Sequence, residues 1–547
     1  MFWRTRTIFV HKFQRFGLME QQERYYPVGI QTFSEIIKGG RVYVDKTDLM
    51  WKAQKLSKYI FLSRPRRFGK SLLSTTFASF FRAEKELFKG LKAMELEKEW
   101  VEYPVIQLDL SIAKGMDTAE DLRSRLMWIV RDYVKKYGID TTGKYPGAVL
   151  SEIIQQAFVR EGKLVVVIID EYDAPLLDVL HENETLESKR KVMQEFYQTL
   201  KASEAMIRFC FITGITKFSQ LSIFSTLNNL TNISLDPAFS AICGITEKEL
   251  QEDLAEDIAL MAKAYQETPE QMYARLKNRY NGYHFSKRSE DIYNPFSLFK
   301  AFTHKKVDNY WFETGTPTFL WHQMKHFRTD ITAMDDIVVP SSAFDVPTEN
   351  MVDALPLLYQ SGYLTIKDYS SYSEVYKLSI PNQEVRIGFT QGLIFSFIGL
   401  KPYEVQMGFA LKFWDALNRP DVELALKEMQ AYFAGLPYIE GFKEKMGDIT
   451  KAEGFYEWTF YLIFSMLNLY VRTQVKTING RADMVVHMPN AIYVFELKIN
   501  GTAKEALEQI NSKGYAVPYQ TDGRKVVKVG VRFSTETLAI EDWEIEE

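Results

Sequence analysis

The chain has little cysteine, no long apolar run and no excess of basic charge. Cys210 and Cys243 are the two cysteines among 547 residues, they form no metal-ligand spacing, and their apolar surroundings are typical of reduced core residues. This usage favours a reducing cytoplasm. No apolar stretch approaches the roughly 18–20 residues that a membrane-spanning helix needs. A net charge of −4 excludes a protein that is basic overall, so any groove for nucleic acid must be local.

Length and charge also bear on how the chain is divided. A chain of 547 residues is too long for one hydrophobic core, so we expect two to four domains. The first 18 residues carry basic but no acidic side chains, and their apolar run is too short for a signal peptide. Our hypothesis is that Met19 is the biological start.

The stretch YIFLSRPRRFGKSLL, residues 59–73, predicts a strand, a Gly-Lys-Ser turn and a helix. This is the context of a phosphate-binding loop, because N–H groups at a helix N-terminus and the helix dipole both favour an anion. Lys70 would reach the β- and γ-phosphates, and the Ser71 hydroxyl would hold Mg²⁺. The loop pattern is incomplete, since Arg64 stands where the first glycine belongs. On these residues alone, a basic strand-to-helix turn is the alternative.

A second motif, LVVVIIDE at residues 164–171, favours nucleotide binding over that alternative. It predicts a fully buried parallel strand that ends in two carboxylates. Asp170 would hold Mg²⁺ through water, and Glu171 would polarise the attacking water. The alternative is a solvated strand end. Because both motifs occur in the right order, nucleotide binding is the better interpretation.

Buried strands alternate with helices through the first 245 residues, which predicts parallel βαβ units. Further strands are expected over residues 41–47, 104–111 and 208–213, with 241–246 as a candidate fifth strand of the sheet. Ligands bind at the carboxyl ends of such strands. Thr213 and Thr216 lie at one such end, where a hydroxyl can sense a γ-phosphate; a plain turn threonine is an equal alternative.

The middle of the chain predicts helices and then a small mixed domain. From about residue 246 the composition is helical and aromatic, which suggests a lid on the nucleotide-binding core. Residues 355–380 follow the order helix, strand, turn, strand, the outline of a small winged-helix domain. Without a basic recognition helix, such a domain more often packs against protein than reads DNA. Residues 404–437 are predicted to be helical.

A third constellation lies near the C-terminus. Asp483 begins one predicted strand, and Glu496 and Lys498 end the next, so a hairpin would bring them together on one side. Two carboxylates can hold one or two Mg²⁺ ions, and Lys498 would position or activate a water. Glu453 or Glu457 could add a carboxylate from the preceding helix. The alternative is a solvated sheet edge with paired charges.

Taken together, the motifs resemble a known two-part family. The stretches that carry the resemblance run from about residue 25 to 533: GIQTF, YVDKT, RPRRFGKSLL, DEYDAPL, FITGITKFS, FSTLNNLTNIS, YNGYHFS, YNPFS, LLYQSGYLTI, GRADMVV, FELK and ALEQI with Tyr515. The chain resembles the bacterial AAA-ATPase-like proteins that carry a C-terminal PD-(D/E)xK nuclease-superfamily domain. The resemblance implies a multidomain α/β fold, with a P-loop NTPase parallel sheet and a restriction-endonuclease-like C-terminal domain.

The resemblance also implies a division of the chain and a set of site residues. The segments are an N-terminal extension (1–24), an AAA-like ATPase core (25–245), a helical lid (246–335), a winged-helix-like domain (336–400), a helical linker (401–450) and a nuclease-like domain (451–547). ATP and Mg²⁺ are the implied cofactors. The residues implied at the phosphates are Arg64, Arg66, Arg67, Gly69, Lys70 and Ser71.

The other implied residues serve metal and water. Asp170 and Glu171 serve the ATPase site, with Asp173 less certain, and Asp483, Glu496 and Lys498 form the nuclease centre. Where relatives often have a carboxylate before the GRAD strand, this chain has Gln474.

Three functions compete. The first is an ATP-gated, Mg²⁺-dependent nuclease, with a role in defence against mobile DNA. The second is a signalling or scaffold NTPase whose tail binds nucleic acid or a partner without cutting. The third is a tail that keeps its fold without metal. The expected partners are ATP and nucleic acid of undefined type, with no membrane, and homo-oligomer formation stays open.

Overall fold

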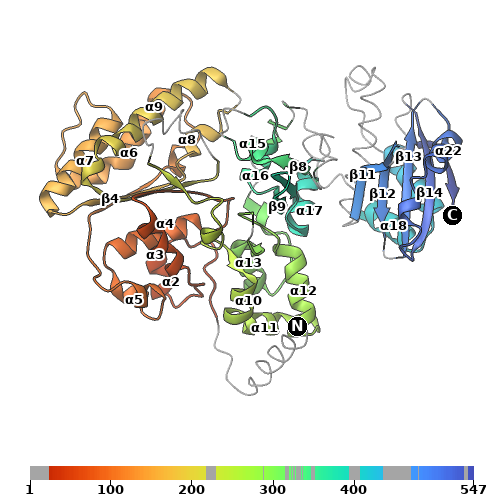
Figure 1. The fold of residues 1–547 in the computed structure, drawn as a ribbon, viewed down its shortest axis with the longest axis horizontal. Helices are drawn as coiled ribbons and strands as arrows, with labels where there is room; N and C mark the ends of the chain where they lie inside the picture. Colours follow the sequence, from red (N-terminus) through yellow and green to blue (C-terminus); the bar gives the residue numbers. More distant parts are fainter. Residues whose placement is uncertain are drawn as a thin grey trace.

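The structure is a computed structural model in which three regions follow one another along the chain (Figure 1). It describes residues 24–180, 182–216, 229–287, 289–314, 320–321, 323–324, 327, 334, 337–346, 351–393, 407–434, 470–477, 480–488, 490–499, 501–534 and 540–547. The proposed start at Met19 lies outside these residues. An α/β region comes first, a helical region with a small sheet follows, and a second mixed sheet ends the chain.

A five-stranded parallel sheet forms the core of the first region. In sheet order the strands are β2 (Val105–Asp109), β3 (Val165–Asp170), β4 (Ile207–Gly214), β1 (Tyr59–Ser63) and β5 (Thr231–Asn232). Every adjacent pair is parallel. All of β3 is buried, as expected for a central strand covered on both faces. Because β1 and β3 are parallel, with β4 between them, the phosphate loop after β1 and Asp170-Glu171 at the end of β3 lie at the same edge of the sheet.

Helices cover both faces of this sheet. They are α2 (Phe33–Lys38), α3 (Thr47–Leu56), α4 (Lys70–Phe81), α5 (Ala93–Leu96), α6 (Ala119–Tyr137), α7 (Pro146–Glu161), α8 (Ala174–Leu177) and α9 (Asn183–Ala202). Alternate strand residues face opposite sides. Ile60 and Ile168 pack with α4, whereas Phe61 and Val167 pack with α6, α7 and α9. In Figure 1, α4 accordingly lies on one side of the sheet, and α6, α7 and α9 lie on the other.

Two expected strands of this region are wrong. Residues 41–46, all of them described, form no strand, and α3 begins at Thr47. The stretch 241–246 does not join the parallel sheet: its end, β6 (Ile245–Thr246), pairs with β7 (Ile292–Tyr293) in a two-stranded ribbon. Hydrophobic alternation alone predicted both, and it does not distinguish a strand from an extended segment that lines a cavity.

The middle region begins with helices and continues into a small sheet. The helices are α10 (Glu247–Asp253), α11 (Ala255–Tyr265), α12 (Pro269–Tyr280) and α13 (Pro295–His304). The elements that follow are β8 (Ile337–Pro340), α15 (Ser341–Phe344), α16 (Leu355–Gln360), β9 (Thr365–Ser370), β10 (Val375–Ser379) and α17 (Gln383–Leu393). The three strands pair antiparallel in the order β8-β10-β9. The winged-helix-like assignment stays a prediction.

The last region is a mixed sheet in the order β11 (Tyr470–Thr477), β12 (Gly480–His487), β13 (Ala491–Lys498), β14 (Lys525–Phe533) and β15 (Ile540–Glu546). The pair β13–β14 is parallel and is linked through α22 (Ala503–Lys513). Two helices from the segment expected to be a linker, α18 (Met407–Asn418) and α19 (Val422–Ala434), lie against this sheet. The Tyr493 hydroxyl donates to the Leu417 carbonyl at 2.7 Å, and Gln430 donates to the Ile540 carbonyl at 2.7 Å.

Glu384 joins the helical part of the middle region to α17. Its carboxylate accepts hydrogen bonds from the backbone N–H groups of Tyr310 (2.7 Å) and Trp311 (3.0 Å). Burial raises the pKa of Glu384 to about 7, and these hydrogen bonds oppose the increase only in part. The folded protein therefore keeps this proton to a higher pH than the unfolded chain does.

This difference predicts a pH-dependent effect of Glu384→Gln. Ionisation of Glu384 favours unfolding as the pH rises through its raised pKa, and glutamine stays neutral. We expect the thermal midpoint of the variant, relative to wild type, to increase between about pH 5 and about pH 8. Glu374→Gln, at an exposed position, is the control. A difference from wild type that stays constant over this range would contradict the assignment.

Candidate functional site

The turn between β1 and α4 has the backbone that a phosphate loop requires. Gly69 precedes α4 with φ = 90°, and Arg67 also has a positive φ of 69°. A Cβ on Gly69 would meet nothing within 4 Å, so glycine is needed for its conformation and not for space. The first N–H groups of the 12-residue helix α4 therefore face the loop, where an anion would be stabilised.

Lys70 lies nearly buried inside this loop, with 4% of its surface exposed. Its ammonium donates to the Pro65 carbonyl at 3.2 Å and lies 3.9 Å from the Glu171 carboxylate. An ammonium has three N–H donors. One neutral acceptor and one distant carboxylate leave capacity for a further anion.

The end of β3 supplies two carboxylates to the same place. Burial raises the pKa of Asp170 to about 6, and a hydrogen bond from the Ser71 side chain opposes the increase. Glu171 has a left-handed backbone with φ = 52°, which is uncommon for a residue other than glycine. Its N–H donates to the Asp170 carboxylate at 3.0 Å. The structure thus brings Lys70, Ser71, Asp170 and Glu171 together.

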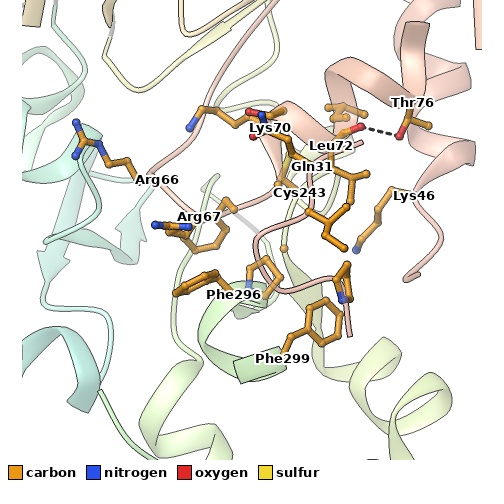
Figure 2. Close-up of a pocket in the computed structure, with 18 of the residues that line it drawn as sticks. Gln31, Lys46, Arg66, Arg67, Lys70, Leu72, Thr76, Cys243, Phe296 and Phe299 are labelled. Carbon is orange, nitrogen blue, oxygen red and sulfur yellow. Dashed lines mark hydrogen bonds between the residues drawn. The ribbon is translucent and has the colours of Figure 1, made fainter. Parts of the chain in front are cut away.

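A cavity of about 490 Å³ opens over Lys70, Ser71 and Glu171 (Figure 2). Its lining comes from residues 27–31, 42–44, 66–73 and 242–245, together with Lys46, Glu171 and two phenylalanines of α13. The Arg67 guanidinium lies 4.3 Å from the ring centre of Phe296, and Lys46 pairs with Glu249 at 2.5 Å. Cationic side chains lie around the phosphate loop, and apolar side chains extend the cavity toward the N-terminal segment and α13. Such a mixture suits a charged ligand with a flat apolar part.

Several lining residues were missed by the sequence-based prediction. Lys46, Phe296 and the segment 42–44 come from elements far from the loop in sequence. The stretches YVDKT and YNPFS were the only signal that could have found them, because they carried the resemblance without any assigned role.

Arg64 does not join this cavity, which corrects its expected place at the phosphates. Only 2% of its surface is exposed, and its guanidinium donates to the carbonyls of Ser63 (3.0 Å), Ser234 (2.7 Å) and Phe239 (3.1 Å). It also lies 4.2 Å from the ring centre of Phe285. Arg64 therefore holds the start of the loop in the protein interior, whereas Arg66 and Arg67 line the cavity.

Thr213 is also turned away from the cavity. Its hydroxyl donates to the Leu62 carbonyl at 2.7 Å in the neighbouring strand, so the hydroxyl proton of this expected γ-phosphate sensor is already used. The hydroxyl of Thr216 donates to Asp173 at 2.6 Å, and Asp173 also accepts from the N–H groups of Ile215 and Thr216. Asp173 thus fixes the segment after β4 beside the DE motif.

The predicted C-terminal group of Asp483, Glu496 and Lys498 comes together on the C-terminal sheet. Asp483 on β12 and Glu496 on β13 come one residue beyond the cross-strand pair Met484–Phe495. The N–H of Leu497 donates to the Asp483 carboxylate at 2.8 Å, and the Lys498 ammonium lies 3.6 Å from Glu496. The hairpin therefore places both carboxylates and the lysine at one end of the sheet.

Gln509, on α22, connects two of these groups although no role was predicted for it. Its side-chain oxygen accepts a hydrogen bond from Lys498 at 2.7 Å, and its side-chain N–H donates to Glu496. The helix α22 packs on β13 and β14, which places Gln509 over the strand end. Only the stretch ALEQI in the resemblance pointed to this residue.

Glu496 is suited to hold a cation. It is 2% exposed, and burial, followed by the negative charge of Asp483, raises the pKa of Glu496 to about 8. One of its oxygens, Oε2, is buried and has no hydrogen-bond partner among the residues that the structure describes. A bound divalent cation would satisfy this oxygen and favour the charged form.

The metal-ligand set is incomplete within the described part of the chain. No group of three or more His, Cys, Asp or Glu side chains gathers there. The candidate third carboxylates, Glu453 and Glu457, lie outside the described residues, as does the side chain of Gln474. The fit to a divalent cation therefore rests on Asp483 and Glu496.

Fold and sites define a multidomain α/β protein with a P-loop NTPase-type parallel sheet and a nuclease-like C-terminal sheet. The family described as "Predicted AAA-ATPase" matches residues 27–224, and the "PD-(D/E)XK nuclease superfamily" matches residues 451–543. A relative from Azotobacter chroococcum mcd 1, "Uncharacterized protein in vnfD 5'region", is 33% identical over 525 residues, which cover 95% of this chain and 98% of the relative. The chain belongs to the AAA-ATPase-like family with a C-terminal PD-(D/E)XK nuclease-superfamily domain. Among the described residues, no helix has the length and apolar character needed to span a bilayer.

Because Arg64 is buried and Arg66 lines the cavity, their substitution by alanine should change the stability of the protein by very different amounts. Arg64→Ala removes a guanidinium from three buried carbonyls, so we expect unfolding free energy to fall by about 2–4 kcal/mol. Arg66→Ala should change stability by less than about 0.5 kcal/mol, because it lines an open cavity. Chemical denaturation of both variants measures this. A loss for Arg64→Ala as small as the one expected for Arg66→Ala would show that Arg64 is not a structural residue.

Proposed function

We propose that the N-terminal cavity binds and hydrolyses ATP. Lys70 would exchange the Pro65 carbonyl for the β- and γ-phosphate oxygens, and Arg66 and Arg67 would add positive charge. Ser71 and Asp170 would hold Mg²⁺, and Glu171 would orient the attacking water. The close grouping of Lys70 and Glu171 at the cavity supports these roles.

The C-terminal site is proposed to be a Mg²⁺-dependent phosphodiesterase acting on nucleic acid. The observation that carries this proposal is the buried, unpartnered Oε2 of Glu496 beside Asp483 and Lys498, within the described residues. Asp483 and Glu496 would hold Mg²⁺, which when bound lowers the pKa of water and stabilises charge on the phosphoryl oxygens. Lys498, held by Gln509, would position the attacking water.

The two activities are proposed to be coupled, so that ATP regulates cleavage. Coupling requires the nuclease site to behave differently with and without nucleotide. Defence against mobile DNA is a role that such a protein would suit. Both cysteines are free and buried, which fits the reducing cytoplasm. Homo-oligomer formation stays open.

A signalling or scaffold NTPase whose tail binds without cutting is the second candidate. The contacts of Lys498 and Gln509 with Glu496 support it, because they already engage one oxygen of a carboxylate that cleavage would need for metal. Such a tail would bind nucleic acid with a strong salt dependence, since phosphate contacts release counterions.

A cleavage assay separates the two candidates. We would incubate linear DNA, circular DNA and RNA with Mg²⁺ or Mn²⁺, with and without ATP. Asp483→Asn should abolish cleavage, since it removes a metal ligand, and Lys70→Ala should abolish the effect of ATP. Asp542→Asn, which removes an exposed carboxylate from the same sheet, is the control. ATP hydrolysis without cleavage of any substrate would favour the scaffold.

Gln509 provides a separate test of the metal site. Gln509→Leu removes the group that connects Lys498 with Glu496, and loss of such a supporting hydrogen bond typically lowers metal affinity by roughly 10-fold or more. Mn²⁺ titration by calorimetry measures the affinity. Ser512→Leu places the same side chain at an exposed position of α22 and should have no effect. Equal affinities in both variants would remove Gln509 from the site.

A further inference from the structure

The phosphate loop contacts the middle region through Phe68 and Pro65. Phe68, which precedes Gly69, is 1% exposed and lies between two aromatic rings of the segment after α12. Its ring centre is 4.7 Å from that of Tyr283 and 5.2 Å from that of Phe285, both in edge-on geometry. Such pairs add about 0.5–1.5 kcal/mol beyond the area they bury. The loop is therefore fixed at one side by rings from outside the parallel sheet.

Pro65 forms a second contact at the start of the loop. Its ring lies against Gly362, which follows α16 and has φ = 89°: a Cβ on this glycine would come within 2.6 Å of the Pro65 Cβ. The Tyr283 hydroxyl donates to the Gly362 carbonyl at 3.2 Å. Gly362 thus permits a close approach of Pro65 that any larger residue would prevent. Tyr283 contacts both Phe68 of the loop and Gly362.

The aromatic segment is itself attached to the three-stranded sheet. The N–H of His284 donates to the Thr365 hydroxyl at 2.8 Å, and this hydroxyl donates to the His284 carbonyl at 3.0 Å. Lys367 donates to the Gly282 carbonyl at 2.6 Å. Residues 282–285 and the strand β9 are therefore connected by two neutral hydrogen bonds and one charged hydrogen bond.

Lys70 connects the contact between Pro65 and Gly362 with the proposed nucleotide site. Its ammonium donates to the carbonyl of Pro65, the residue that packs on Gly362. Phosphate oxygens would compete with this carbonyl for the lysine, because a charge-assisted hydrogen bond to an anion is stronger than one to a neutral acceptor. Nucleotide would thus change the hydrogen bonding of Pro65 at the point of contact.

We propose that Phe68 and Pro65 are positioning residues that transmit nucleotide occupancy from the phosphate loop to the sheet β8–β10 through Tyr283 and Gly362. The inference rests on the proposed ATP site and gives it a physical route into the middle region. Packed contacts of this kind switch between discrete arrangements and do not deform continuously. A coupling energy is the quantity that decides whether the route operates.

Hydrogen exchange of the full chain, with and without a non-hydrolysable ATP analogue and Mg²⁺, tests the proposal. In wild type, nucleotide should change exchange of peptides within residues 355–380. With each protein saturated with the analogue, the exchange change at 355–380 should be smaller in Phe68→Leu than in wild type by about half or more. Phe77→Leu is the matched control, because Phe77 packs on Phe209 and Phe211 of β4 and not on the middle region.

The outcomes separate the inference from the proposed function. If wild type does not bind the analogue, the ATP site is wrong and the route is wrong with it. If wild type binds but exchange at 355–380 is unchanged, or if Phe68→Leu responds like Phe77→Leu, only the route is overturned. Should Phe68→Leu fail to fold, Tyr283→Phe decides: it keeps the ring and removes the bond to Gly362, and a response equal to wild type overturns the proposal.

Discussion

Burial of the Lys70 ammonium is the constraint on which the N-terminal region depends. A buried cation costs several kcal/mol unless anions or acceptors surround it. Among the described residues, one carbonyl at 3.2 Å and one carboxylate at 3.9 Å are its recorded partners. In the parallel sheet, β1 and β3 end at the same edge, and α4 begins there at Lys70. This arrangement places the ammonium near these two partners. An anion in the cavity would complete the coordination of this ammonium.

The C-terminal sheet buries an acidic group, Glu496, as the N-terminal region buries a basic one. Asp483 and Glu496 lie close together in a buried place, and proximity and burial both raise the pKa of Glu496. Lys498 and Gln509 compensate only one oxygen of Glu496, and Oε2 stays without a partner among the described residues. A cation at this buried site would contact Oε2 and favour the charged form of Glu496. Each of the two sites therefore has a buried ionisable group whose contacts a ligand of opposite charge would complete.

Sequence predicted the parts of these sites that depend on local pattern. The strand–turn–helix at residues 59–73 and the buried strand before Asp170 follow from hydrophobic runs and one glycine, and the 483–498 hairpin follows from strand alternation. The rest depends on tertiary packing. Lys46 and Phe296 reach the cavity from distant segments, and Gln509 reaches its site only because α22 crosses β13. Arg64 was placed at the phosphates by the family resemblance and Thr213 by its position at a strand end, but both side chains donate hydrogen bonds to buried carbonyls instead.

The position of Arg64 explains how a phosphate loop can lack its first glycine. A glycine there would leave the start of the loop free to move, whereas the guanidinium binds three carbonyls and fixes it. The same side chain lies over Phe285, the ring that also contacts Phe68. Arginine in place of glycine therefore restricts the start of the loop and connects it with Phe285 of the middle region. The loop then cannot rearrange around a ligand without disturbing these contacts, which is the physical requirement for a nucleotide site that regulates something outside itself.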